Sequence, residues 1–194
     1  EFRRVLFRSD GDIDIEDIAL ALASIARYNG HAKQFYSVAQ HSLLVAQQVP
    51  EEHKLAALVH DAAEAYVGDM IHPLKSSPLL AGYRRLCDYV EGKVAAFFGV
   101  SYPWHPSVKE ADLRMLVTEK REVIISHPFP WGVEASYAPY EGVEIVEENP
   151  DRGKMMERWR RAVVDCLMRA GWANPTGPHS PALRGVLAKM GEDL

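Results

Sequence analysis

Nearly every periodic stretch of this chain has the period of an α-helix. Ile15, Ile18, Leu22 and Ile25 are spaced by three and four residues, which places their side chains along one stripe. Stripes of the same kind follow along 37–50, 52–66, 83–97, 107–125 and 151–170. We therefore expect an all-α fold, a single bundle of five to six main helices.

Capping signals mark several helix ends. Ser37 with Gln40 forms a capping box at the start of the second helix, and Ser107 with Glu110 repeats this pattern at the fifth. Glycines are expected to end the first, third and sixth helices, at Gly30, Gly68 and Gly171.

The length favours one domain. A chain of 194 residues that is 47% hydrophobic can bury one substantial core, and a second core is not expected. We expect residues 1–10 to be a leader outside the fold, 11–172 to form the domain and 173–194 to be a C-terminal tail. Segment 126–150 is rich in proline, glycine and aromatic residues and predicts a long loop, with room for a short hairpin.

The charge restricts the partners. A net charge of −5 and a pI near 5.9 argue against a protein that coats nucleic-acid polymers, whereas a small charged substrate remains compatible. No run of about 18 apolar residues suggests a membrane span. The chain has only two cysteines, so neither a disulfide scaffold nor a cysteine zinc site is indicated. We expect a cytoplasmic location and a homo-oligomer.

The stretch AALVHDAAEAYVGDM places ionisable residues in an apolar helical setting. His60 and Asp61 are adjacent at the end of an apolar run, and Glu64 shares a helix face with His60. On the second helix His41 lies in an amphipathic segment, and on the fifth helix Asp112 lies on the inward stripe. Because an unpaired buried carboxylate costs several kcal/mol, such acids are normally paired or bound to a metal ion.

His41, His60, Asp61 and Asp112 form a mixed nitrogen and oxygen ligand set. Such a set suits one divalent transition metal ion, Mn, Fe, Co, Ni or Zn, and leaves octahedral positions open for water and substrate. Each residue alone has an ordinary explanation, a hydrogen-bonded histidine or a surface acid near a helix N-terminus. The combination in this order favours a catalytic metal site.

This order of helical residues, His41, then His60–Asp61, then Asp112, resembles the HD-domain metal-dependent phosphohydrolases. Within that superfamily, YSVAQHSLLVA and ALVHDAAEAYVGDMIHPLK resemble the bacterial 5′-deoxynucleotidases and phage dATP triphosphohydrolases. The resemblance covers roughly residues 12–125 and is weaker from 126 onward. It implies one metal ion held by these four residues. It also implies hydrolysis of small (deoxy)nucleotides, either to nucleoside and phosphate or with release of triphosphate.

The resemblance also implies roles for residues beside the metal. Glu64 and Asp69 match acids that orient or deprotonate the attacking water, and Arg27 matches a phosphate-binding arginine. Lys75 is a further cation near the motifs, equally compatible with a solvated loop lysine. Tyr36 belongs to RYNGHAKQFY, whose aromatic and amide side chains suit a nucleotide base but are also ordinary turn residues.

Other functions use the same residue types. His31 and His72 would have to hold a second metal ion in a di-metal oxygenase or an HD-type phosphodiesterase. A non-catalytic nucleotide-binding HD protein is a further alternative, although such a protein has no need to keep Glu64 and Asp69 beside an intact ligand set. Lys120, in TEKRE, is expected on a charged, exposed helix face.

Overall fold

The computed structural model describes residues 13–125, 129–145, 151–173 and 179–192, so the predicted leader lies outside it. Every regular element in these residues is a helix, which confirms the all-α class. The α-helices are α2 (Ile15–Ser24), α3 (Val38–Ala46), α4 (Lys54–Val59), α5 (Glu64–Val67), α6 (His72–Lys75), α7 (Ala81–Phe98), α8 (Pro106–Glu122), α9 (Arg152–Ala173) and α10 (Pro181–Glu192). Short 3-10 turns are η1 (Arg27–Gly30), η2 (Glu51–His53), η3 (Pro78–Leu80) and η4 (Val133–Ala135). Among the helices described, none is long and apolar enough to span a membrane.

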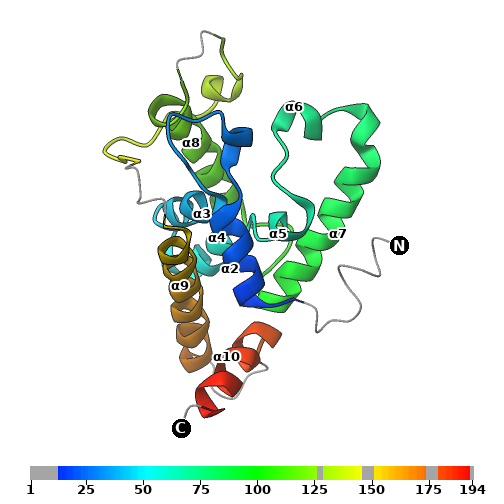
Figure 1. Ribbon diagram of the computed structural model, residues 1–194, viewed down its shortest axis with the longest axis vertical. Helices are drawn as coiled ribbons and strands as arrows, with labels where there is room; N and C mark the ends of the chain where they lie inside the picture. Colours follow the sequence, from blue (N-terminus) through cyan, green and yellow to red (C-terminus); the bar gives the residue numbers. More distant parts are fainter. Residues whose placement is uncertain (1–12, 126–128, 146–150, 174–178, 193–194) are drawn as a thin grey trace.

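The core lies where α2, α3, α4 and α9 pack against one another (Figure 1). α9 is the longest helix described, and Met155, Trp159 and Leu167 of its predicted inward stripe are buried. The indole N–H of Trp159 donates a 3.1 Å hydrogen bond to the carbonyl of Leu58 in α4. This bond joins α9 to the segment that carries His60.

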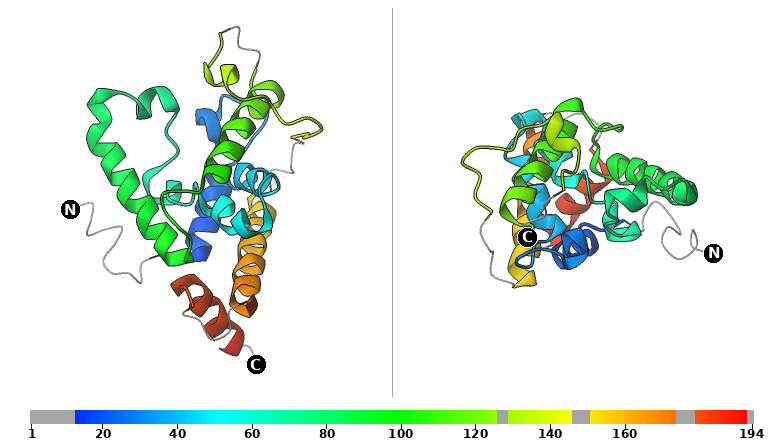
Figure 2. Two further views of the ribbon diagram at one scale, coloured as in Figure 1. Left: turned by 180° about the vertical axis from the view of Figure 1, so that it is seen from behind. Right: turned by 90° about the horizontal axis from the view of Figure 1, so that it is seen from above.

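α6 and the first half of α7 form an arm that extends away from the core, whereas Val90, Val94 and Phe98 in the second half of α7 are buried in it (Figure 2). α10 packs against α7 and α9 at the end of α7 far from α6. Two glycines, one at the end of α7 and one in α9, allow α10 and the residue before it to lie close to these helices. Gly99 ends α7 with a φ of 74°, and a Cβ there would lie 2.7 Å from Cβ of Ser180. A Cβ on Gly171 would lie 2.8 Å from Leu183 Cδ2. The prediction that Gly171 ends the sixth helix is therefore wrong, because Gly171 is a contact residue within α9, which continues to Ala173.

The first helix is shorter than predicted, because α2 ends at Ser24 and not near Gly30. After Ser24 the backbone becomes extended, and the amide of Arg27 bonds to the carbonyl of Tyr36 at 2.9 Å. Hydrogen bonds that a longer helix would have supplied are thus made across a short antiparallel bridge. This pairing places Arg27 and Tyr36 next to the start of α3.

The predicted third helix, 52–66, is interrupted. α4 ends at Val59 and α5 begins at Glu64. Between them the backbone tightens, and the amide of Glu64 bonds to the carbonyl of Asp61, three residues earlier, at 2.9 Å. His60 and Asp61 therefore lie on a tight turn between two helices.

Two helix starts test the capping predictions. Ser37 caps α3 as predicted, because its hydroxyl accepts a 3.1 Å hydrogen bond from the amide of Gln40. The predicted cap of α8 is wrong. Its cap is His105, whose Nδ1 accepts from the amide of Ser107 at 3.2 Å, because a proline occupies the first helical position.

In the described part of the predicted loop, residues 129–145, the structure has one short turn, η4, and no strand. Contacts with α8 hold this segment. Lys120 pairs with Glu134, and the hydroxyl of Thr118 accepts from the amide of Tyr140 at 2.9 Å. Lys120 is therefore engaged by the loop, in contrast to the exposed face predicted for it.

Candidate metal centre

Three helical segments bring His41, His60 and Asp112 together. His41 lies in α3, Asp112 in α8, and His60 directly follows α4. Both histidines are buried, and Asp112 is half-buried. Oδ1 of Asp112 lies 3.1 Å from Nε2 of His41 and 3.8 Å from Nε2 of His60. One potential ligand atom from each residue lies within 4.8 Å of the others, close enough to share one metal ion.

Asp61, the fourth predicted ligand, reaches the same place. Its Oδ2 lies 3.5 Å from Nε2 of His41 and 3.3 Å from Nε2 of His60. The same oxygen is 3.4 Å from the guanidinium of Arg27. Asp61 therefore faces both the imidazole pair and a buried cation.

Hydrogen bonds orient both imidazoles. Nδ1 of His41 donates to the carboxylate of Glu119, and Nδ1 of His60 donates to the carbonyl of Ala57 at 2.7 Å. Because these partners are acceptors, each Nδ1 carries a proton, and in the neutral form that binds a metal ion the lone pair of Nε2 faces the cluster. In the described part of the chain, neither Nε2 makes a hydrogen bond of acceptable geometry. Two buried, unsatisfied nitrogens aimed at carboxylates fit a metal ion.

The electrostatics of the cluster also favour a cation. Burial opposes the charge on His60, but Asp61 and Asp112 outweigh it and raise the pKa of His60 to about 10. Burial likewise opposes the charge on His41, yet Glu119 and Asp112 raise its pKa. Against burial, the neighbouring imidazoles of His41 and His60 hold the pKa of Asp112 well below its usual range. The acids attract positive charge to this point, and a divalent ion supplies such charge.

Glu64, Asp69 and Lys75 lie beside the cluster. Glu64 is 7% exposed; its Oε1 accepts from Lys75 at 3.2 Å, and its buried Oε2 has no hydrogen-bond partner among the described residues. Burial, and then repulsion from Asp61, raise the pKa of Glu64 well above its usual range. Burial raises the pKa of Asp69 too, despite the attraction of Arg27. Carboxyl groups with raised pKa are suited to general acid or base chemistry.

Arg27 and Tyr36 are buried next to the proposed ligands. Besides Asp61, the guanidinium of Arg27 contacts Oε2 of Glu119 at 3.1 Å. Tyr36 is 1% exposed, and its hydroxyl donates to Oε1 of Glu119 at 2.7 Å. Both side chains therefore support the site from within, whereas Lys75 is only partly buried. The geometry gives Tyr36 no surface that a nucleotide base could reach.

Glu119, an acid that several side chains of the site contact, was not predicted from the sequence. It is 0% exposed, although TEKRE was expected on an exposed face. Hydrogen bonds reach it from four side chains, those of Arg27, Tyr28, Tyr36 and His41. The signal was present in the spacing, because Glu119 follows Asp112 by seven residues, two turns along the same helix face.

The turn that carries Tyr28 has an unusual backbone. Tyr28 and Asn29 have φ angles of 57° and 53°, and Gly30 follows with 80°. Residues other than glycine rarely adopt this left-handed region, and such strain often marks functional segments. Here the turn directs the hydroxyl of Tyr28 to Glu119. The centroid of the Tyr28 ring lies 5.8 Å from that of Trp131 in the loop after α8.

His31 and His72, the ligands that a second metal ion would require, are both exposed. Neither belongs to the group of potential ligands found in the described residues. No geometric observation therefore favours a two-metal site.

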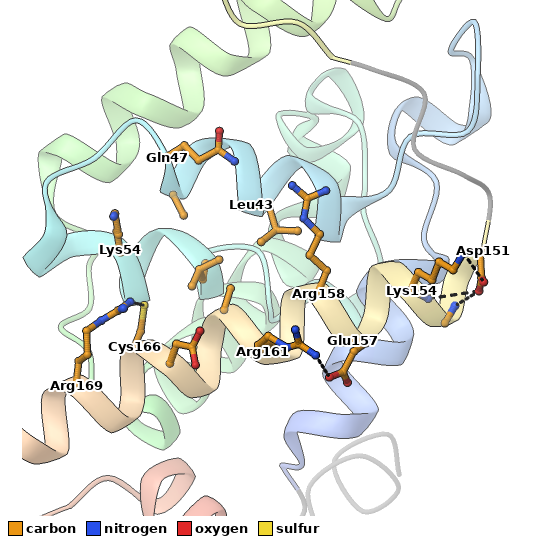
Figure 3. A pocket seen from close by; sticks show the side chains of 15 residues that line it. Leu43, Gln47, Lys54, Asp151, Lys154, Glu157, Arg158, Arg161, Cys166 and Arg169 are labelled. Atoms are coloured by element: carbon orange, nitrogen blue, oxygen red, sulfur yellow. Dashed lines mark hydrogen bonds and ion pairs between the residues drawn. The ribbon is translucent and has the colours of Figure 1, made fainter.

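A cavity of about 810 Å³ lies elsewhere, between α9 and the pair α3 and α4 (Figure 3). Charged side chains on its rim pair with one another, Lys154 with Asp151 at 4.0 Å and Arg161 with Glu157 at 3.4 Å. None of the residues of the metal centre lines this cavity. The cavity is thus distinct from the centre.

Comparison with known proteins gave two relatives. No family model matches the chain. The chain is 39% identical to the uncharacterized protein YfdR of Escherichia coli over 150 residues, which cover 76% of this chain and 83% of YfdR. It is 42% identical to an uncharacterized protein of Rhodobacter capsulatus over 109 residues, 52% of this chain and 55% of that protein. Neither name states an activity, so a function has to be inferred from the residues.

Proposed function

The chain belongs to the same protein family as YfdR, and we propose that it is a divalent-metal-dependent phosphohydrolase that acts on small (deoxy)nucleotides. The observation that carries this proposal is the pair of buried imidazoles, His41 and His60, whose Nε2 atoms face the carboxylates of two acids, Asp61 and Asp112. A third acid, Glu64, is buried beside them. The resemblance of the motif segments to HD-domain phosphohydrolases supports the same reaction class.

His41, His60, Asp61 and Asp112 would hold the ion. A divalent ion supplies Lewis acidity, which activates water and polarises a phosphoryl oxygen. The chain's own hydrogen bonds, through Nδ1 of both histidines, keep the ligand nitrogens oriented. The ligands are thus prepared by the fold before substrate arrives.

Glu64 is the proposed proton acceptor. It is buried, its Oε2 is unpaired among the described residues, and burial raises its pKa above the usual range, which suits a carboxyl group that exchanges a proton. Asp69 would orient the same water. Lys75, already bonded to Glu64, is the partly exposed cation that can meet a phosphate group. A protein that only bound nucleotides would gain nothing from a buried carboxylate whose second oxygen has no partner among the described residues, because such a group is costly to bury.

A substrate screen tests the proposal. The purified protein, supplied in turn with Mn²⁺, Co²⁺, Fe²⁺, Ni²⁺ or Zn²⁺, would be incubated with nucleoside and deoxynucleoside mono-, di- and triphosphates, and both products would be identified. We expect metal-dependent release of phosphate or triphosphate with the matching nucleoside, and no release by a His60→Ala variant. A metal-loaded protein that cleaves no nucleotide would refute the proposal.

A further inference from the structure

Glu119 lies at the base of the metal centre, where it joins His41 to Arg27. Its Oε1 accepts from Nδ1 of His41 and from the hydroxyl of Tyr36. Its Oε2 accepts from Arg27 and from the hydroxyl of Tyr28. The carboxylate is fully buried.

The two oxygens of Glu119 face different kinds of donor. A hydroxyl can rotate to donate or accept, and a neutral imidazole can carry its proton on either nitrogen. A guanidinium only donates and stays charged in proteins. Arg27 therefore requires an acceptor at one end of the side chain at position 119. The atom at the other end then decides which nitrogen of His41 carries the proton.

We propose that Glu119 is a positioning residue that fixes the tautomer of His41, keeping its Nε2 free for the metal ion, with Arg27 fixing the orientation of Glu119. This inference rests on the metal centre of the proposed function and is independent of the substrate. It assigns the carboxylate of α8 a part in metal affinity although it is no ligand. It also makes Arg27 a support of the metal centre, beyond any contact with phosphate.

Glutamine at position 119 gives a sharp test, because it keeps the size of the side chain and has only one acceptor atom. Arg27 would hold the amide oxygen, and the NH₂ group would then face Nδ1 of His41. Nδ1 would have to accept, so the proton would move to Nε2 and block the metal. Glu119→Ala, in contrast, leaves the tautomer of His41 free.

The experiment measures Co²⁺ affinity of the metal-free wild type, Glu119→Gln, Glu119→Ala and Tyr36→Phe by visible absorption, together with thermal midpoints. Outer partners of metal ligands typically contribute 10- to 100-fold in affinity, so we expect a loss of about tenfold for Ala and about 100-fold or more for Gln. The thermal midpoints should have the opposite order, with Glu119→Gln more stable than Glu119→Ala, because glutamine fills the buried space and alanine leaves a cavity. A role in packing alone would give both measurements the same rank.

Tyr36→Phe is the matched control, because it removes a donor to the same oxygen and leaves the bond to His41. Its Co²⁺ affinity should change by less than about threefold, since Glu119 keeps its other donors. If Glu119→Ala does not fold, the comparison of Glu119→Gln with Tyr36→Phe decides, and equal losses would overturn the inference. Glu119→Gln binding Co²⁺ as tightly as wild type, or more tightly than Ala, would overturn it too.

The same titration separates this inference from the proposed function. A wild-type protein that binds Co²⁺, shows the expected order of variants and hydrolyses no nucleotide would refute the phosphohydrolase and leave the role of Glu119 standing. A wild-type protein that binds no divalent ion would refute both.

Discussion

Among the acids of the candidate centre, Glu64 has the role that a single substitution tests most directly. It is buried and near the ligands, and its unpaired Oε2 suits a proton acceptor. We expect Glu64→Gln to keep metal content and fold while kcat falls by roughly 100-fold or more, the usual scale for loss of a general acid or base. Metal per chain and kcat on the best nucleotide measure this. Glu52→Gln, at an exposed position, is the control, and parallel loss of metal and activity would make Glu64 a ligand instead.

The same variant should change how stability depends on pH. Burial raises the pKa of Glu64 above its usual value of 4.5, so the folded state holds this proton more tightly than the unfolded chain does. The associated stabilisation is fully present below pH 4.5 and is lost as pH rises through the folded pKa. Glutamine has no proton to lose. Relative to wild type, metal-free Glu64→Gln should therefore gain stability as pH rises from about 4.5.

Thermal midpoints of both proteins with a chelator present, measured from acid to mildly alkaline pH, test this linkage. The difference in midpoint should widen with pH and then level off. A difference that is the same at every pH would contradict a raised pKa for Glu64.

Among the helices, the docking of α10 depends on Gly99. Any other residue at position 99 would have to adopt a φ of 74°, and its Cβ would lie only 2.7 Å from Cβ of Ser180. We expect Gly99→Ala to lower the free energy of unfolding by about 1–3 kcal/mol, since left-handed backbone alone costs alanine roughly 1–2 kcal/mol. Urea unfolding gives the value. Gly185→Ala, in α10 with no atom near its Cβ position, is the control and should stabilise by about 0.5–1 kcal/mol.

The sequence predicted which segments form the long helices, but it did not predict several of the residues at which helices end. The three-and-four spacing of apolar residues predicted the long helices because it reflects burial of one face, which the core imposes. Glycine has two uses, as a helix stop and as a point of close approach, and the sequence alone did not show that Gly171 faces Leu183. The break before Glu64 was hidden for a similar reason, because a tight turn of three-residue spacing keeps the residue types of a helix.

For the whole molecule, metal binding should increase stability, because an ion that binds only the folded state shifts the unfolding equilibrium. At a free metal concentration about 100 times Kd, we expect the free energy of unfolding to rise by about 2.7 kcal/mol. Thermal melts with metal and with chelator measure the change. Asp61→Ala should lose this increment and its activity, while Asp165→Ala, an exposed acid, should keep both. An Asp61→Ala protein with full metal content and normal turnover would exclude Asp61 as a ligand.

The overall charge bears on substrate size. The net charge of −5 makes association with a long polyanion unfavourable, whereas a single nucleotide needs only local cations such as Lys75. We expect hydrolysis of free nucleotides to be much faster than hydrolysis of long single-stranded DNA. Equal rates on equal amounts of phosphate, at low and at moderate salt, would contradict this.

The sequence predicted the ligand residues of the candidate metal centre better than the residues that hold those ligands in place. His41, His60 and Asp112 could be identified because ionisable residues on apolar stripes have few alternatives to a metal or a partner. Glu119 was missed because charged neighbours in TEKRE suggested solvent, and because its four donors come from segments far away in sequence. Such a network becomes visible only when the fold brings η1, α3 and α8 together.

The hydrogen bond from Trp159 to the carbonyl of Leu58 also has an optical consequence. Trp159 is fully enclosed, and its acceptor lies two residues before His60. A water-borne quencher reaches an enclosed indole only when the surrounding core opens, because native packing leaves no path for it. We therefore expect the emission of this indole to be blue-shifted relative to that of an exposed tryptophan, and its quenching to report on the turn that carries His60 without an attached label.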